Sequence, residues 1–204
     1  MSFSKVLVAL ALVVGGPLAA AYADDLNPPP WRGQPGSTFG TWEFSTSDPN
    51  PLPEPGSVYP WGPPSTVVTP GLLQTWLPDW NGRFGVWPLS GEIVVEIPNQ
   101  PLPNPYKVVW IQLTWTEQAP NVFPTVSETR FNIPAGLVNR MPLLNGWFHD
   151  TYSIYIEPNP DWERILISGA VNVDEMVIDT ICVPEPMTLG LLALGGLALI
   201  RRKG

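Results

Sequence analysis

The chain has 204 residues, 18 of them acidic and 10 basic, so its formal net charge is −8 at neutral pH. A negatively charged surface repels phosphate backbones, which argues against a nucleic-acid partner. The single cysteine and the single histidine exclude an intramolecular disulfide and a zinc site of the cysteine–histidine type.

The first residues have the layout of a secretory signal peptide. Lys5 is the only charge before Asp24, residues 6–18 are apolar, and Ala21-Tyr22-Ala23 follows. A signal peptidase accepts small residues at this spacing. We therefore expect residues 1–23 to be a signal peptide that is removed after Ala23, and the protein to be exported.

The next part of the chain, residues 24–182, has the size of one domain with its own core. All 18 acidic residues but only six of the ten basic ones lie between Asp24 and Pro186, which gives this part a net charge of about −12 and suits a soluble exported protein. Twenty of the 27 prolines lie between Pro28 and Pro124, and all ten tryptophans lie in the same domain. Segments this rich in proline cannot form helix interiors or central strands, so they are expected to be extended connections. Disordered chains are poor in aromatic residues, so the tryptophans indicate that these connections pack against the domain.

Short runs of strand-forming residues recur through the domain, with proline or glycine between most of them. In residues 107–117, Val109, Ile111, Leu113 and Trp115 alternate onto one face, and Trp110, Gln112 and Thr114 take the other. No run has a sustained helical period. The sequence predicts an all-β fold, a jelly-roll-like antiparallel β-sandwich. The expected strands are residues 37–45, 65–69, 71–77, 91–97, 107–117, 151–157, 163–169 and 171–181.

The residues that could perform catalysis do not form a known pattern, and we expect no enzyme activity. His149 neighbours Asp150, but no nucleophile signature accompanies them, and adjacent strand residues point to opposite faces. A surface loop is the expected place for His149. Glu92 and Glu96 would lie about 13 Å apart along a strand, too far for a glycosidase pair.

Exposed aromatic rings could bind the faces of sugars. Residues 75–87 contain Trp76, Trp80 and Trp87 among polar side chains, so this segment is the candidate glycan platform. The alternative is that each ring packs in the core or under a loop, because aromatic side chains bury large areas.

Calcium is the one cofactor that the sequence admits. Glu43, Asp48, Asp174 and Asp179 could supply carboxylate ligands between early and final strands. The alternative is that they are solvated acidic residues, and nothing in the chain resembles an EF-hand loop.

The final residues have the chemistry of a membrane segment. Residues 187–200 carry no charge, and as a helix they would be about 21 Å long, short of the roughly 30 Å hydrocarbon core. A buried core helix is the alternative. The apolar character on every side, the preceding Pro184 and Pro186 and the following Arg201-Arg202-Lys203 favour a transmembrane helix with a basic cytoplasmic stop.

Val183-Pro184-Glu185-Pro186, followed by this helix and basic cluster, resembles the PEP-CTERM sorting signal of Gram-negative bacteria over residues 183–204. The resemblance implies that an exosortase, a membrane transpeptidase, recognises the tail and cuts near Pro-Glu-Pro, and that the body then passes to the cell surface. Through "WRGQPGSTFGTWEFST" and "VDEMVIDTICVPEP" the body also resembles PEP-CTERM proteins of planctomycete-type bacteria, a group with no assigned activity.

Together these features predict an exported protein that the C-terminal helix holds in the membrane until processing. We expect a non-enzymatic structural or adhesive role at the cell surface or in the extracellular matrix. The alternative function is a carbohydrate-binding module for extracellular polysaccharide. The expected partners are therefore the exosortase, the membrane and a polysaccharide.

Overall fold

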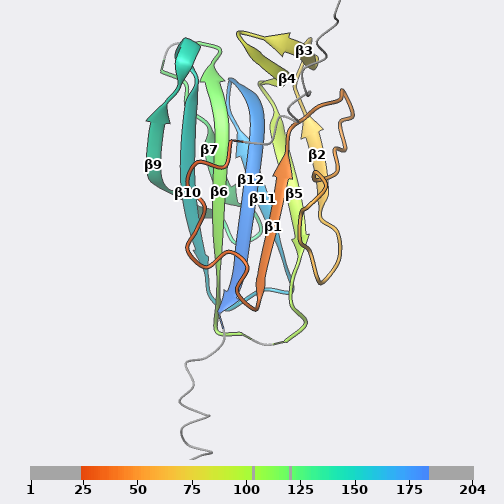
Figure 1. The fold of residues 1–204 in the computed structure, drawn as a ribbon, viewed down its shortest axis with the longest axis vertical. Coiled ribbons are helices and arrows are strands. Elements are labelled where there is room, and N and C mark those ends of the chain that lie inside the picture. Colours follow the sequence, from red (N-terminus) through yellow and green to blue (C-terminus); the bar gives the residue numbers. More distant parts are fainter. Residues whose placement is uncertain (1–23, 103, 120, 184–204) are drawn as a thin grey trace, which may run out of the picture.

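The computed structural model describes residues 24–102, 104–119 and 121–183, whose strands form two antiparallel sheets packed face to face as a β-sandwich (Figure 1). Within these residues the only helical element is a 3-10 turn at Leu144–Gly146. The all-β prediction is therefore confirmed, and so is the packing of two antiparallel sheets.

The larger sheet has seven strands. Six of them follow one another across the sheet in the order β3 (Leu77–Trp80), β4 (Arg83–Leu89), β12 (Val171–Val183), β6 (Tyr106–Glu117), β10 (Phe148–Ile156) and β9 (Gly136–Pro142). The seventh, β1 (Ser37–Trp42), pairs with residues 176–181 of β12, on the side where β4 pairs with residues 171–173. The long strands β6 and β12 form the middle of this sheet.

The smaller sheet has five strands and faces the larger one. Its order is β2 (Ser65–Thr69), β5 (Glu92–Pro98), β11 (Trp162–Ser168), β7 (Thr125–Glu128) and β8 (Ile133–Pro134). The chain changes sheet on both sides of β2, between β4 and β5, between β5 and β6, between β6 and β7, between β8 and β9, and on both sides of β11. These crossings bring residues that are distant in sequence to the two ends of the sandwich.

Several strand predictions agree closely with the structure and others are wrong. Strand β2 has the predicted bounds, and β6 differs from its prediction by one residue. Residues 71–76 form a turn and a loop instead of a strand, because Gly71 and Leu73 adopt φ values of 107° and 63°, and β3 begins only at Leu77. The sequence does not predict strand β4, because glycine normally argues against a strand. Here Gly85 is required, since its φ is 80° and a Cβ at this position would lie 2.5 Å from the carbonyl oxygen of Phe44. The sequence also does not predict β3, β7, β8 and β9, which are short or lie mostly exposed at an edge.

The core lies between the sheets, and the predicted alternation in β6 is confirmed there. Val109, Ile111, Leu113 and Trp115 are all fully buried. The opposite face of β6 is also covered, because Gln112 and Thr114 are fully buried as well. An exposed outer face would have left these polar side chains in water, so another segment must lie over this sheet.

The two segments that flank the predicted domain lie outside the described residues, except for Val183. Strand β12 ends at Val183, the first residue of the predicted sorting motif. The signal peptide, Pro184, Glu185 and Pro186, the apolar segment 187–200 and the basic cluster at 201–203 lie outside the described residues. No helix in the described part of the chain has the length and apolar character needed to cross a membrane.

Candidate functional site

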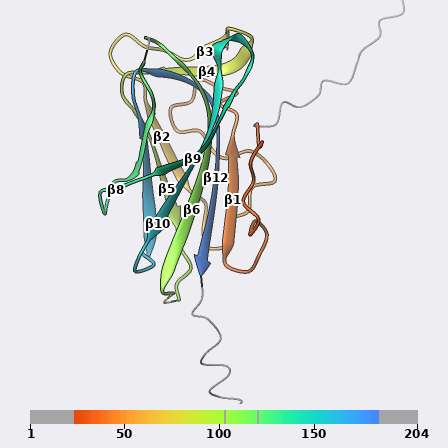
Figure 2. The ribbon, with the colours of Figure 1, turned by 90° about the vertical axis from the view of Figure 1, so that its left-hand side faces the viewer.

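The covering segment is the N-terminal strap, which we define as residues 24–34. It runs in front of the larger sheet in Figure 1 and along the outer side of β1 in Figure 2. Its prolines at positions 28–30 have no backbone N–H, so this stretch cannot pair as a strand. The strap is instead attached to the sheet largely through side chains.

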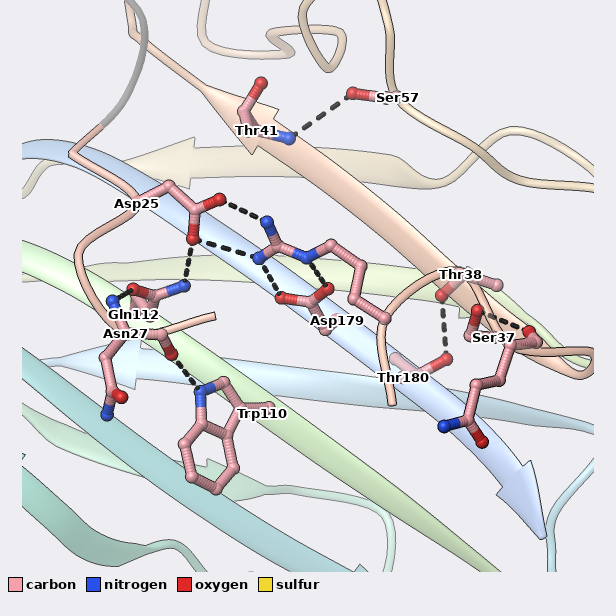
Figure 3. A network of polar contacts seen from close by, with 12 residues as sticks. Asp25, Asn27, Ser37, Thr38, Thr41, Ser57, Trp110, Gln112, Asp179 and Thr180 are labelled. Carbon is pink, nitrogen blue, oxygen red and sulfur yellow. Dashed lines mark hydrogen bonds and ion pairs between the residues drawn. The ribbon is translucent and has the colours of Figure 1, made fainter. Parts of the chain in front are cut away.

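Arg32 is the main attachment of the strap, and Figure 3 labels the two carboxylates that its guanidinium joins, Asp25 and Asp179. Its guanidinium forms a bidentate ion pair with Asp179 of β12, with distances of 2.5 Å from Nε to Oδ1 and 2.7 Å from Nη2 to Oδ2. It also pairs with Asp25 within the strap. Burial raises the pKa of Asp179 to about 6, although Arg32 opposes this shift. At Asp25 burial also raises the pKa, but the hydrogen bonds from Arg32 and Gln112 outweigh it, so the pKa of Asp25 is lowered. Arg32 thus neutralises a carboxylate whose side chain is fully buried.

Asn27 connects the strap to β6 and β10. Its backbone N–H donates to Oε1 of Gln112 at 2.7 Å, and its side-chain amide donates to Thr151 at 3.1 Å. The indole of Trp110 donates to the carbonyl oxygen of Asn27 at 2.8 Å. These bonds give Gln112, Thr151 and Trp110 hydrogen-bond partners on the outer face of the sheet, as buried polar groups require.

A second polar group, which we call the acidic cluster, consists of Asp24, Glu43, Asp174 and Glu175. Arg83 lies 2.6 Å from Asp24, 3.1 Å from Asp174 and 3.4 Å from Glu175. A register shift in β12 between Val173 and Glu175 brings two consecutive acidic residues to the same cation. Burial, with the neighbouring negative charges, raises the pKa of Glu43 to about 7, of Asp174 to about 6 and of Glu175 to about 9.

The acidic cluster predicts that the protein is most stable in mildly acidic solution. A carboxyl group with a raised pKa binds more protons in the folded than in the unfolded state. Its contribution to the free energy of unfolding is therefore fully present below the pKa of the unfolded state and is lost as pH rises through the pKa of the folded state. His149 and Asp25 have lowered pKa values and act in the opposite direction at low pH. We expect the melting temperature to peak near pH 5–6 and the free energy of unfolding to fall by on the order of 2 kcal/mol towards pH 9.

Thermal melts across this pH range test the prediction. Glu175→Gln should flatten the decline above pH 6, while the same change at the exposed Glu92 should leave the profile unaltered. A melting temperature that rises steadily to pH 9 would contradict the assignment.

The four candidate calcium ligands are not brought together in one site: Glu43 and Asp174 belong to the acidic cluster, whereas Asp48 and Asp179 lie elsewhere. Asp179 is paired with Arg32, and Asp174 with Arg83. Asp48 lies in an exposed loop and accepts a hydrogen bond from the backbone N–H of Asn50 at 2.9 Å. Among the described residues, no group of three or more histidine, cysteine, aspartate or glutamate side chains is arranged to hold a metal ion.

The three tryptophans of the candidate glycan platform have different surroundings. Trp87 is 4% exposed and lies in the core. Trp76 is half-buried against the core, and its indole donates to the carbonyl oxygen of Phe44 at 2.8 Å. Trp80 is half-buried and packs edge-on against Trp147, with 5.8 Å between ring centroids. The three rings therefore do not form an exposed platform.

His149 lies in β10 under the strap, so its predicted place in a surface loop is wrong. It is 1% exposed, and its ring nitrogens lie 2.9 Å from Thr114 Oγ1 and 3.1 Å from Gln112 Oε1. Burial lowers the pKa of His149. Asp150 points into the sandwich instead, where it pairs with Arg140 and accepts a hydrogen bond from Tyr152. The two neighbours therefore serve separate polar networks on opposite faces of the sheet.

An aromatic ring beside a pocket occurs at the smaller sheet, where the sequence did not suggest one. Trp162 is 37% exposed and borders a pocket of about 370 Å³. The guanidinium of Arg130 lies 4.1 Å from its ring centroid. The remaining lining residues are Pro63, Ser65, Glu96, Ile97, Pro98 and Asp161.

A buried polar cluster, which we call the inter-sheet cluster, lies at the end of the sandwich where β12 finishes. Lys107 of β6 and Glu163 of β11 point towards each other from opposite sheets, both with fully buried side chains and 2.6 Å between Nζ and Oε1. Asn99, just after β5, places its Oδ1 2.5 Å from the same Nζ. Cys182 donates from Sγ to this oxygen at 3.0 Å.

The sequence contains a signal for the inter-sheet cluster in the positions of two charged residues. Lys107 precedes Val109 by two residues and Glu163 precedes Ile165 by two, so both charged residues lie at inward positions of their strands. Charged residues at core positions are rarely buried unless they are paired. Two such residues in separate strands predict a buried ion pair.

Comparison of the chain with protein-family models, with curated proteins and with solved structures finds no match in any of the three.

Proposed function

We propose that this protein is exported, is sorted to the cell surface by an exosortase acting on its C-terminal tail, and has a non-enzymatic structural or adhesive role there or in the extracellular matrix. The observation that carries the proposal is the position of the folded body between the two processing sites. Asp24, the first residue after the expected signal-peptide cut, already binds Arg83. Strand β12 remains paired through Val183, the residue before Pro184.

Both expected cuts would leave the described contacts of the sandwich intact. The strap needs Asp25, Asn27 and Arg32, all of which remain after cleavage at Ala23. The proline that follows β12 has no backbone N–H and would end the strand at the motif. A stable body joined to a cleavable tail is the arrangement that the sorting reaction requires.

We further propose that the connectivity is jelly-roll-like. The strand orders β1-β12-β6-β10 in one sheet and β5-β11-β7-β8 in the other agree with two interlocked Greek keys, with β2, β3, β4 and β9 added at the edges. This connectivity places the final strand in the middle of the larger sheet. A pull on the tail would therefore act on a strand that is paired on both sides.

A structural role is supported by the way the polar residues are used. The buried carboxylates Asp179, Asp150 and Glu163 each lie against a cation from another segment. Such pairs hold the strap, the edge strand β9 and the two sheets together. The three carboxylates therefore stabilise contacts between segments of the protein and are paired with cations inside it.

The proposal is tested by following the protein in a bacterium that has an exosortase. We expect the wild-type body in the surface or extracellular fraction, and we expect replacement of Pro184 and Pro186 by alanine to leave it in the membrane fraction at its uncut size. Asp48→Asn, in an exposed loop, is the control and should be sorted normally. Normal release of the double variant, or of the wild type from cells without exosortase, would contradict the proposal.

The second candidate function is binding of extracellular polysaccharide, and the pocket beside Trp162 favours it. A half-exposed aromatic ring with the carboxylates Glu96 and Asp161 nearby has the mixed apolar and polar lining of a ligand site. If this function holds, Trp162→Ala should lower retention on extracellular polysaccharide at least tenfold, and Trp80→Ala should not. Failure of the wild-type protein to bind would rule the function out.

A further inference from the structure

The inter-sheet cluster contains the parts of a self-catalysed amide cross-link. We propose that the protein forms a covalent bond between Nζ of Lys107 and Cγ of Asn99, with Glu163 as the proton-transfer residue and ammonia as the leaving group. This modification goes beyond the proposed function and does not depend on sorting.

The reacting atoms are already close. Nζ lies 2.5 Å from Oδ1 of Asn99, and because a C=O bond is about 1.2 Å long, Nζ is within about 3.7 Å of the carbonyl carbon. That separation is close to the attack distance of well-oriented reactants. Lys107 is 0% exposed and Asn99 is 6% exposed, so water has little access to compete.

Glu163 is placed to activate the amine. Its Oε1 lies 2.6 Å from Nζ, yet neither of its oxygens has a hydrogen-bond partner of good geometry in the described structure. Burial raises the pKa of Glu163 to about 7, although the charges of Lys107 and Arg130 oppose this. At this distance the carboxylate is positioned to take a proton from Nζ of Lys107, and the amine that this produces is the nucleophile.

The amide of Asn99 is held on both sides. Its Oδ1 accepts hydrogen bonds from the backbone N–H of Gln100 at 3.2 Å and from Cys182 at 3.0 Å. These donors would stabilise negative charge on the oxygen after attack. Its Nδ2 donates to Asn159 Oδ1 at 3.1 Å and to the carbonyl oxygen of Pro160 at 2.5 Å, which fixes the orientation of the leaving nitrogen.

The reaction balances without a cofactor, an oxidant or a reductant. Glu163 accepts one proton from Lys107, and the neutral amine then forms the Nζ–Cγ bond. Glu163 transfers protons from Nζ to Nδ2, the Cγ–Nδ2 bond breaks, and ammonia departs. The product is a secondary amide, and the molecule becomes lighter by one ammonia. The cross-link would tie the end of β5 to the start of β6, where the chain passes between sheets, in a protein that cannot form an intramolecular disulfide.

Peptide mapping of the denatured full chain tests the proposal. Trypsin cuts after Arg83, Lys107 and Arg130 in this region, but it does not cut after a lysine whose side chain is an amide. We expect one peptide spanning residues 84–130, lighter by one ammonia, and no peptide that ends at Lys107. Glu163→Gln should restore cutting and the full mass, whereas Glu157→Gln, at an exposed glutamate, should retain the cross-link.

Two outcomes would overturn the proposal. The first is a wild-type protein that is cut after Lys107 and shows two peptides of full mass, which decides the matter even if Glu163→Gln fails to fold. The second is loss of ammonia that persists in Lys107→Arg, since a succinimide formed at Asn99 from the backbone nitrogen of Gln100 has the same mass change but does not need Lys107.

Discussion

Replacing Arg32 by alanine should lower the free energy of unfolding by about 3 kcal/mol at neutral pH. The change removes the bidentate partner of Asp179, whose side chain is fully buried, and it also releases Asp25. Losing one member of a buried ion pair is costly because the other charge remains without compensation. Urea unfolding followed by tryptophan fluorescence measures the loss.

Three comparisons isolate the cause of this effect. Arg164→Ala removes an ion pair with Glu96 whose two side chains are 45% and 39% exposed, so it should cost less than about 1 kcal/mol. The double change Arg32→Met with Asp179→Leu should recover most of the stability, because no buried charge is left unpaired. The loss in Arg32→Ala should also shrink at pH 5, where Asp179 can become neutral. A loss as small as that of Arg164→Ala would contradict the structural role of the strap.

Replacing Trp115 by alanine should cost about 4 kcal/mol of stability, within the range for large buried aromatic side chains. Trp115 is 0% exposed, and its ring lies 5.1 Å from that of Phe148 and 5.9 Å from that of Phe123, measured between centroids. The change opens a cavity between the two sheets that their paired backbones cannot close. The same denaturant unfolding measures it.

Trp115→Phe is the matched control for cavity size. Its loss should be about half as large, since most of the ring volume remains and the indole N–H has no hydrogen-bond partner in the described structure. Trp162→Ala, at a ring that is 37% exposed, should cost less than about 1 kcal/mol. Equal losses at Trp115 and Trp162 would contradict the packing described here.

Strands were predictable from the sequence where apolar and polar residues alternate, and these strands were enough to indicate the fold class. Residues 65–69 and 107–117 show this period, and both became strands with nearly the predicted bounds. This alternation did not predict the structure where the backbone conformation of a single residue determines whether the chain turns or continues as a strand. Gly71 and Leu73 turn the chain at positive φ, and Gly85 permits a strand to pass close to the carbonyl of Phe44.

The candidate sites were less predictable, because they depend on contacts between distant residues. Trp87 and Trp80 are seven residues apart, yet one is in the core and the other packs on Trp147. The pairing of Arg32 with Asp179 spans almost the whole domain. Local sequence reports residue types and periods, but the partner of a charged or aromatic side chain is set by the order of strands in the sheets.

We propose that the sandwich reaches the cell surface after one cut at Ala23 and a second cut near Pro184-Glu185-Pro186. Mass spectrometry of both termini of the protein recovered from the cell surface tests this directly. We predict a chain that begins at Asp24 and ends within or beside Pro184-Glu185-Pro186. Recovery of the surface protein with residues 1–23 or 187–204 still attached would contradict the claim.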